Sequence, residues 1–173
     1  VGYATAAIGK WGQLPGEPDE AGFDDYLRFN GSGVYWSRDE SKLERYRVNG
    51  DERKLNTSEY MPDLMHDQAM RFIRANQSKP FFLYYPTIIP HVALHVPDEE
   101  LKPYLDQQWN DPPFTADKGG YTPHFTPRAA YAAMITRMDR EVGRILALVK
   151  ELGLDENTLI VFTSDNGPLY DEL

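Results

Sequence analysis

The sequence predicts an α/β fold in which a mixed, largely parallel sheet is sandwiched between helices. Two helix-then-strand units carry this prediction: a helix over 61–75 precedes a strand over 81–85, and a helix over 127–152 precedes a strand over 158–163. Such pairs are typical of α/β folds. Both strands are short, unbroken apolar runs, which indicates strands buried on both faces. If the strands are parallel, the loops that follow them lie at one edge of the sheet.

The composition is that of a folded domain, and it excludes several kinds of protein. The 173 residues are 41% hydrophobic and 13% aromatic, which is enough for one domain with a real core. A net charge of −9 argues against broad binding to nucleic acid or to anionic membranes, which a basic surface favours. The absence of cysteine excludes disulfides and thiolate metal sites within these residues, and no apolar run approaches the length of a membrane span.

The two predicted helices have recognisable ends. Ser58 or Asp63 can cap the first helix. Thr126 and Pro127 begin the second helix, and Gly153 ends it. An apolar stripe along the second helix is expected to pack on the sheet, because its members recur every three or four residues: Met134, Met138, Val142, Ile145, Val149 and Leu152.

The remaining segments predict turns and loops. Residues 29–57 resemble an inserted hairpin, with strand candidates at 34–36 and 46–48. The adjacent carboxylates within 21–26 could act as ligands, but they are more typical of a helix start or a solvated turn. Residues 98–126 predict an irregular surface loop. Alternatively, this loop contacts a substrate through some of its ring-bearing side chains: Tyr104, Trp109, Tyr121 and His124.

Two oxygen-bearing side chains follow the strand predicted over 158–163. Asp165 and Asn166 precede a Gly-Pro break, at the carboxyl end of the strand, where α/β sheets bind their ligands. Their hard oxygens suit Ca²⁺ or Mg²⁺ better than a soft metal. Asp-Asn-Gly also fits an ordinary turn, and two oxygens alone are too few to hold a cation. The residue pattern leaves both interpretations open.

Other candidate side chains also lie where a strand meets a loop. His91 and His95 follow the strand over 81–85, but the prolines around them argue against the helix that a metal site with this spacing would need. We expect one functional histidine at most, and His91 is closer to the strand. Lys10 ends a stretch that could form a strand, while composition alone also fits a surface lysine beside Trp11.

Five short motifs are spread over essentially the whole chain: Gly2-Tyr3 with Gly9-Lys10-Trp11, Gly22-Phe23-Asp24, Pro80 to Tyr84 with Pro90-His91, Met138-Asp139 with Val142-Gly143, and Thr163 to Gly167. Each motif alone is weak, but together and in this order they resemble the arylsulfatase-type sulfatases of the alkaline phosphatase superfamily. The resemblance implies an incomplete alkaline-phosphatase-like sulfatase fold. It also implies that residues 1–173 are the central part of the catalytic domain, an internal fragment.

The same resemblance implies a hydrolase that cleaves an aryl or carbohydrate sulfate ester. The family uses a formylglycine, made from Cys or Ser in a C/S-x-P-x-R motif, beside a bound Ca²⁺, so Ca²⁺ is expected in preference to Mg²⁺. By motif, Asp165 and Asn166 resemble the calcium ligands. Lys10 resembles the lysine that contacts the sulfate group, and His91 resembles the histidine that reaches the sulfate or the leaving oxygen.

This sequence departs from the family pattern in two ways. Position 12 is a glycine, where the family often has a histidine that assists the nucleophile. The C/S-x-P-x-R motif does not occur in these residues, and neither does the early Asp-Asp pair that completes the calcium shell in the family; we expect both upstream of Val1. The small C-terminal subdomain of the family is expected beyond Leu173. This fragment alone should therefore be inactive.

Two other functions stay open at this point. A phosphodiesterase or phosphonate hydrolase of the same superfamily would share the sheet and the metal position. A sulfatase-like binding protein would keep the fold and lack the nucleophile. The expected partner is a small-molecule or glycan sulfate ester, with no nucleic acid and no membrane span. The family resemblance implies a periplasmic, secreted or lysosomal location.

Overall fold

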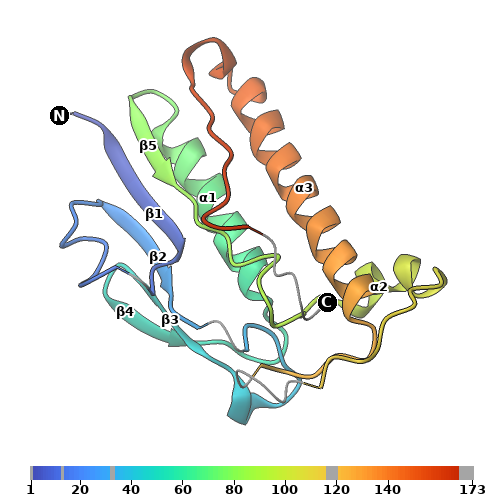
Figure 1. Ribbon diagram of the computed structural model, residues 1–173. Helices are drawn as coiled ribbons and strands as arrows, with labels where there is room; N and C mark the ends of the chain where they lie inside the picture. Colours follow the sequence, from blue (N-terminus) through green and yellow to red (C-terminus); the bar gives the residue numbers. More distant parts are fainter. Residues whose placement is uncertain (1, 13, 32–33, 116–120, 168–173) are drawn as a thin grey trace.

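A five-stranded sheet forms the centre of the computed structural model, which describes residues 2–12, 14–31, 34–115 and 121–167. The strand order is β4-β3-β2-β1-β5 (Figure 1). β1 pairs in parallel with β2 and β5, whereas β3 and β4 extend the sheet in antiparallel fashion. The predicted mixed α/β sheet is confirmed. Its strands are β1 (Ala4–Lys10), β2 (Asp25–Phe29), β3 (Arg45–Val48), β4 (Asp51–Lys54) and β5 (Phe81–Tyr84).

The main helices are α1 (Met61–Asn76), α2 (Asp98–Leu105) and α3 (Pro127–Glu151). α1 packs on β1 and β5, and α3 packs on α1 and α2 (Figure 1). Both long helices match their predicted ranges. α3 packs mainly on the other helices, and Met134 and Met138 of its apolar stripe reach the core cluster that includes Ala6 and Ile8 of β1. No helix in the described ranges is long and apolar enough to cross a membrane.

α3 begins at Thr126 and Pro127 as predicted, whereas neither Ser58 nor Asp63 occupies the N-cap position of α1. Tyr60 and Thr126 occupy the N-cap positions, and neither side chain makes a capping hydrogen bond. Ser58 bonds to Asn56 instead, with 2.9 Å between the Ser58 backbone nitrogen and Oδ1. A proline in the first turn of each helix removes one N–H that would otherwise need a partner. Gly153 has a φ of +67°, as expected for the residue that ends α3.

The two faces of the sheet have different cover. Ala6 and Ile8 of β1 belong to the main core beneath α1. Ala7 points to the opposite face, where it forms a smaller cluster with Tyr26 of β2 and with two loop residues, Trp11 and Phe23. On β5 the side chains of Phe82 and Tyr84 are exposed. The prediction that this strand is buried on both faces is therefore wrong for the described residues, because none of their helices packs on that face.

Three loop predictions also need correction. Asp24 and Asp25 lead into strand β2, because the Asp24 carboxylate accepts hydrogen bonds from the backbone and hydroxyl of Thr5, each 2.9 Å long, and so ties β2 to β1. Residues 34–36 form no strand, and Tyr35 is buried in the core. The loop over 98–126 contains helix α2. A hairpin does lie within residues 29–57, but its strands are β3 and β4, so only the candidate at 46–48 is confirmed.

The run over 158–163, predicted as a buried strand, is not a strand. Its apolar side chains are largely in solvent, with exposed fractions of 89% for Leu159, 75% for Val161 and 70% for Phe162. An extended run becomes a strand only when a neighbouring strand satisfies its backbone, and no described strand pairs with this one. The segment instead returns from the end of α3 towards the loop after β5 (Figure 1).

Candidate active site

β1 and β5 end side by side, and each leads to a predicted site residue. Lys10 is the last residue of β1, in agreement with the strand that was one of its two interpretations. Its backbone N–H donates a 2.9 Å hydrogen bond to the carbonyl of Pro86, just beyond β5. Because the strands are parallel, Lys10 and residues 85–97, here called the histidine loop, leave the sheet at the same edge.

Gly9 allows the two strand ends to approach this closely. It has a φ of +142°, and a Cβ built there would lie 2.1 Å from the carbonyl oxygen of Pro86. Any side chain at position 9 would strain the backbone and push the histidine loop away from β1. Gly9 therefore lets the histidine loop lie close to the end of β1, and Lys10 places a cation at the same edge of the sheet.

The histidine loop is anchored in the core, while His91 lies at its surface. The His91 backbone N–H donates a 3.0 Å hydrogen bond to the carbonyl of Ile88. The His91 ring is exposed, and its Nδ1 bonds to the carbonyl of Val92. With Nδ1–H as the donor, a neutral His91 keeps the lone pair of Nε2 for another partner. The anchoring side chains are Ile88, Ile89, Ala93, Leu94 and Val96.

Lys10 and Asp165 both influence the charge of His91. Although part of the ring reaches solvent, partial enclosure lowers the pKa of His91 below 6.5, and the positive charge of Lys10 lowers it further. The carbonyl of Val92 and the carboxylate of Asp165 oppose this shift. Predicted site residues from three separate segments thus lie within electrostatic reach of His91.

Asp165 and Asn166 form an exposed bend after the extended run. Nδ2 of Asn166 donates a 2.8 Å hydrogen bond to the carbonyl of Gly167, which leaves Oδ1 available to a cation. Carboxylate and amide oxygens are ligands that Ca²⁺ prefers, so the donors fit in kind. They are too few, since nowhere in the described ranges do three or more His, Asp or Glu side chains gather in a way that could hold a metal.

His95 has a structural place in the core. Its side chain is 8% exposed, and its ring packs edge-on against Tyr35 with 4.9 Å between ring centroids. Burial lowers the pKa of His95 to about 4, so the ring is neutral at pH 7. His91 is therefore the histidine of this loop that is placed to meet a ligand.

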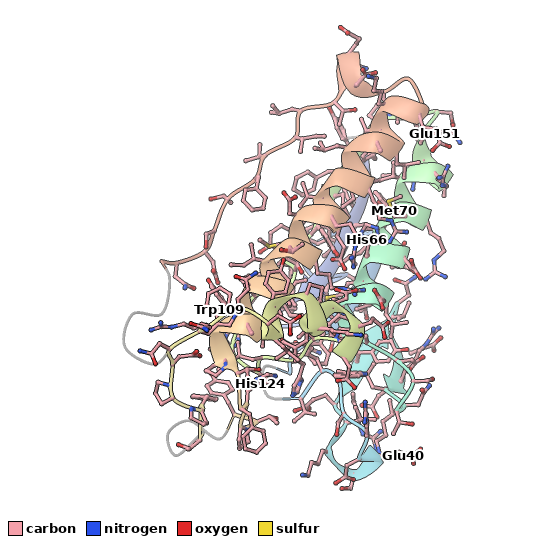
Figure 2. All side chains as sticks on the ribbon, turned by 90° about the vertical axis from the view of Figure 1, so that its right-hand side faces the viewer. Glu40, His66, Met70, Trp109, His124 and Glu151 are labelled. Carbon is pink, nitrogen blue, oxygen red and sulfur yellow. The ribbon has the colours of Figure 1, made fainter. Side chains whose placement is uncertain are left out.

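Among the ring-bearing side chains of 98–126, Tyr121 lies against His91, with 5.8 Å between ring centroids in an edge-on arrangement. Trp109 donates a 2.7 Å hydrogen bond from Nε1 to the carbonyl of Tyr104. Nδ1 of His124 accepts a 3.1 Å hydrogen bond from the backbone of residue 126. Figure 2 shows Trp109 and His124 near the junction of α2 and α3.

Comparison with known proteins decides the family. A family model described as Sulfatase matches residues 1–172. The chain belongs to the sulfatase family. This sulfatase chain is 27% identical to the arylsulfatase of Klebsiella aerogenes, a match that covers 96% of the chain and 45% of that protein. It is 29% identical to the N-acetylgalactosamine-6-sulfatase of Canis lupus familiaris, covering 96% of the chain and 31% of that protein.

Two solved structures have a similar fold. The crystal structure of Ps i-CgsB matches with a TM-score of 0.68 at 26% identity, over 90% of this chain and 35% of that one. The structure of BT4656 in complex with its substrate D-Glucosamine-2-N, 6-O-disulfate matches with the same TM-score of 0.68 at 19% identity, over 89% of this chain and 45% of that one. The sulfatase chain thus spans less than half the length of the relatives it matches.

Two buried tyrosines of the sulfatase chain contact the histidine loop and were not predicted. The Tyr35 hydroxyl donates to the carbonyl of Ala93 and lies 3.4 Å from the carbonyl oxygen of His91. The Tyr60 hydroxyl donates a 2.8 Å hydrogen bond to the carbonyl of His95. Sequence periodicity carries no signal for such contacts, because each joins residues at least 35 positions apart.

Position 12, where the family pattern often has a histidine, has room for a side chain in this structure. A Cβ built at Gly12 would lie 3.6 Å from the nearest atom, the carbonyl oxygen of Asn30, which is an ordinary contact. The glycine is therefore not required there by close packing.

Proposed function

We propose that this sulfatase chain supplies one side of an active site that hydrolyses an aryl or carbohydrate sulfate ester. Lys10 and His91 bind the sulfate group, and Asp165 and Asn166 are calcium ligands. The observation that carries the proposal is the hydrogen bond between Lys10 and Pro86, since it fixes the end of β1 against the loop that holds His91.

Lys10 and His91 have different tasks. The ammonium group of Lys10 neutralises the negative charge on the sulfuryl oxygens, where charge must be stabilised during transfer. His91 is neutral before substrate binds, because its pKa is lowered. An arriving sulfate group brings negative charge, which raises the pKa of the ring and favours its protonated form. As the bond between sulfur and the leaving oxygen breaks, protonated His91 donates its Nε2 proton to that oxygen. Water supplies the hydroxyl that replaces the leaving group on sulfur, and the remaining proton of this water returns to His91.

A calcium ion bound to Asp165 and Asn166 would supply positive charge for a sulfate oxygen and for the nucleophile. The nucleophile proposed from the resemblance is a formylglycine from outside these residues. The relatives supply the substrate class: one is named an arylsulfatase and another an N-acetylgalactosamine-6-sulfatase. Ps i-CgsB was also solved in complex with k-i-k-neocarrahexaose, at 26% identity to this chain. We therefore propose a small-molecule or glycan sulfate ester as substrate, in a periplasmic, secreted or lysosomal setting.

The test is a parallel assay of the complete protein on a sulfate monoester, a phosphate diester and a phosphonate ester. Preferred turnover of the sulfate ester, abolished when Ca²⁺ is chelated and restored by adding it, is the expected result. Preferred turnover of the phosphorus esters would assign the chain to a phosphodiesterase or phosphonate hydrolase instead. Saturable binding of the sulfate ester without any turnover would identify a binding protein that has lost catalysis.

A further inference from the structure

Tyr60 joins the start of α1 to the histidine loop. Its side chain is 5% exposed, and its hydroxyl donates a 2.8 Å hydrogen bond to the carbonyl of His95. His95 follows His91 by four residues in the same loop, so this bond restrains the backbone on the far side of His91 from the strand. The carbonyl is nearly buried with the ring of His95, and without the tyrosine it would lose a partner that solvent cannot easily replace.

Arg137 holds the ring of Tyr60 in place. The guanidinium carbon lies 4.7 Å from the centroid of the Tyr60 ring, within the range of a cation–π contact. Arg137 is itself 7% exposed, an unusual degree of burial for an arginine unless carboxylates compensate its charge.

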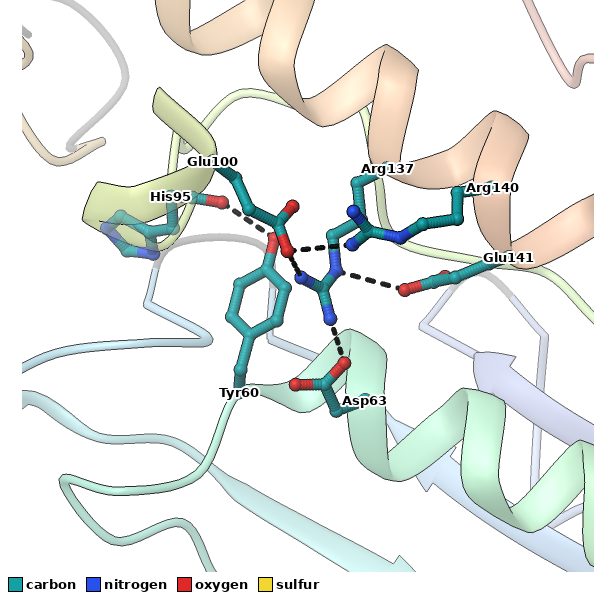
Figure 3. A network of polar contacts seen from close by, with 7 residues as sticks. All are labelled: Tyr60, Asp63, His95, Glu100, Arg137, Arg140 and Glu141. Atoms are coloured by element: carbon teal, nitrogen blue, oxygen red, sulfur yellow. Dashed lines mark hydrogen bonds and ion pairs between the residues drawn. The ribbon is translucent and has the colours of Figure 1, made fainter. Parts of the chain in front are cut away.

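Three helices supply those carboxylates. Arg137, on α3, pairs with Asp63 of α1, with Glu100 of α2 and with Glu141 of its own helix, the last at 3.0 Å (Figure 3). Arg140 also reaches Glu100, at 2.7 Å. Each of the three guanidinium nitrogens is paired with a carboxylate, and these pairs hold the guanidinium group against the Tyr60 ring.

The histidine loop is attached on both sides of His91, and the cluster provides the attachment on the C-terminal side. Tyr60 holds the loop at residue 95, and Glu100 holds α2, which begins directly after the loop at Asp98. On the other side, the Lys10 backbone holds the loop at Pro86. His91 lies between these attachment points.

We propose that Tyr60, fixed by Arg137, is a positioning residue that sets the place of His91 relative to Lys10. The inference rests on the proposed function, because it needs His91 to act on the leaving oxygen. No hydrogen bond or ring contact joins Tyr60 to Lys10 or His91 in the described structure, so we infer that it acts through the loop backbone. Small displacements of a proton donor cost large factors in rate, since proton transfer requires hydrogen-bond distance to the leaving oxygen.

The experiment compares two aryl sulfates in the complete enzyme. Nitrophenyl sulfate releases a stable phenolate that needs little help from a proton donor, whereas unsubstituted phenyl sulfate releases a more basic one. Tyr60→Phe should lower kcat/KM for phenyl sulfate about tenfold and for nitrophenyl sulfate about twofold, as expected when a proton donor is misplaced. The ratio of the two kcat/KM values does not depend on the amount of folded enzyme, so partial unfolding cannot produce this result.

Tyr46→Phe is the matched control. Tyr46 belongs to the same core and is 8% exposed, but it lies on β3, and the substitution should leave the ratio unchanged. Arg137→Lys keeps a cation beside Tyr60 and should change the ratio less than Arg137→Met. An unchanged ratio in Tyr60→Phe, or an equal change in Tyr46→Phe, would overturn the inference.

His91→Ala separates this inference from the function on which it rests. His91→Ala should change the ratio at least as much as Tyr60→Phe, and the double variant should show no further change, because both act on one proton donor. If His91→Ala changes the ratio and Tyr60→Phe does not, the positioning role is wrong and the role of His91 stands. If His91→Ala leaves the ratio unchanged, the proposed role of His91 is itself wrong.

Discussion

Gly9 lies so close to Pro86 that a Cβ at Gly9 would come within 2.1 Å of the Pro86 carbonyl oxygen. This contact, more than any side-chain interaction, brings the lysine of one strand to the histidine loop of another. It also explains why a glycine directly precedes the candidate lysine, which the sequence motif alone could not explain.

Gly9→Ala should therefore damage both stability and activity. The new methyl group must displace the histidine loop or strain a left-handed backbone, which costs more than about 1 kcal/mol of unfolding free energy. Chemical denaturation of the complete protein measures this loss. Gly143→Ala is the control. A Cβ at Gly143 meets no other atom, and the residue lies within α3, where alanine should raise the free energy of unfolding by roughly 0.5 to 1 kcal/mol. Equal stability of the two variants would contradict the close approach.

Lys10→Ala should reduce turnover of a sulfate ester by about two to three powers of ten, the usual effect of removing one preorganised charge-stabilising group. Steady-state kinetics of the complete enzyme measures it. Lys54→Ala, on the exposed strand β4, should have no effect. Normal turnover in Lys10→Ala would remove Lys10 from the site.

Asp165→Asn should weaken calcium binding roughly tenfold or more, since the charge of its ligands sets the affinity of a calcium site. Calorimetric titration of the complete, metal-free protein with Ca²⁺ measures the affinity without reference to activity. Asp155→Asn, an exposed residue in the turn after α3, is the matched variant and should bind as the wild type does. An unaltered affinity in Asp165→Asn would place the calcium ligands elsewhere.

The buried ring of His95 should make the protein sensitive to acid. Burial lowers its pKa in the folded state from 6.5 to about 4, so the folded state disfavours the proton that the unfolded state accepts. Its contribution to stability is present above pH 6.5 and is lost as the pH falls towards 4, by up to about 3 kcal/mol. His95→Phe keeps a ring against Tyr35 and cannot titrate. Between pH 7 and pH 4 the melting temperature should fall less in His95→Phe than in the wild type. An equal fall in both proteins would refute the prediction.

Periodicity and apolar runs were enough to predict α1, α3 and β5, because each of these elements is defined by residues close in sequence. β2 was missed because its first residue, Asp25, and Asp24 just before it favour turns locally. Their place beside β1 depends on Thr5, which is nineteen residues away from Asp24. α2 was missed because the prolines and charges around it resemble a loop, although Pro103 lies inside the helix.

The candidate site was predictable at the level of residue type. Lys10, His91 and Asp165 could be chosen because each follows a strand-like run or matches a motif. Their neighbours could not be chosen in this way. Tyr60 and Arg137 are a buried aromatic and a charge that look like ordinary helix residues, and only the packing of α1, α2 and α3 gives them a shared role.

The exposed run over 158–163 has a practical consequence for anyone who produces this chain by itself. Leu159, Ile160, Val161 and Phe162 form an uncharged, proline-free and strongly β-prone segment that lies in solvent. β5 pairs only with β1 among the described strands, so its other edge also offers unpaired backbone groups. An apolar segment and an open strand edge on one molecule can join those on the next, as in cross-β stacking. We expect the isolated chain to aggregate through this segment, and a lysine at Val161 to keep it in solution.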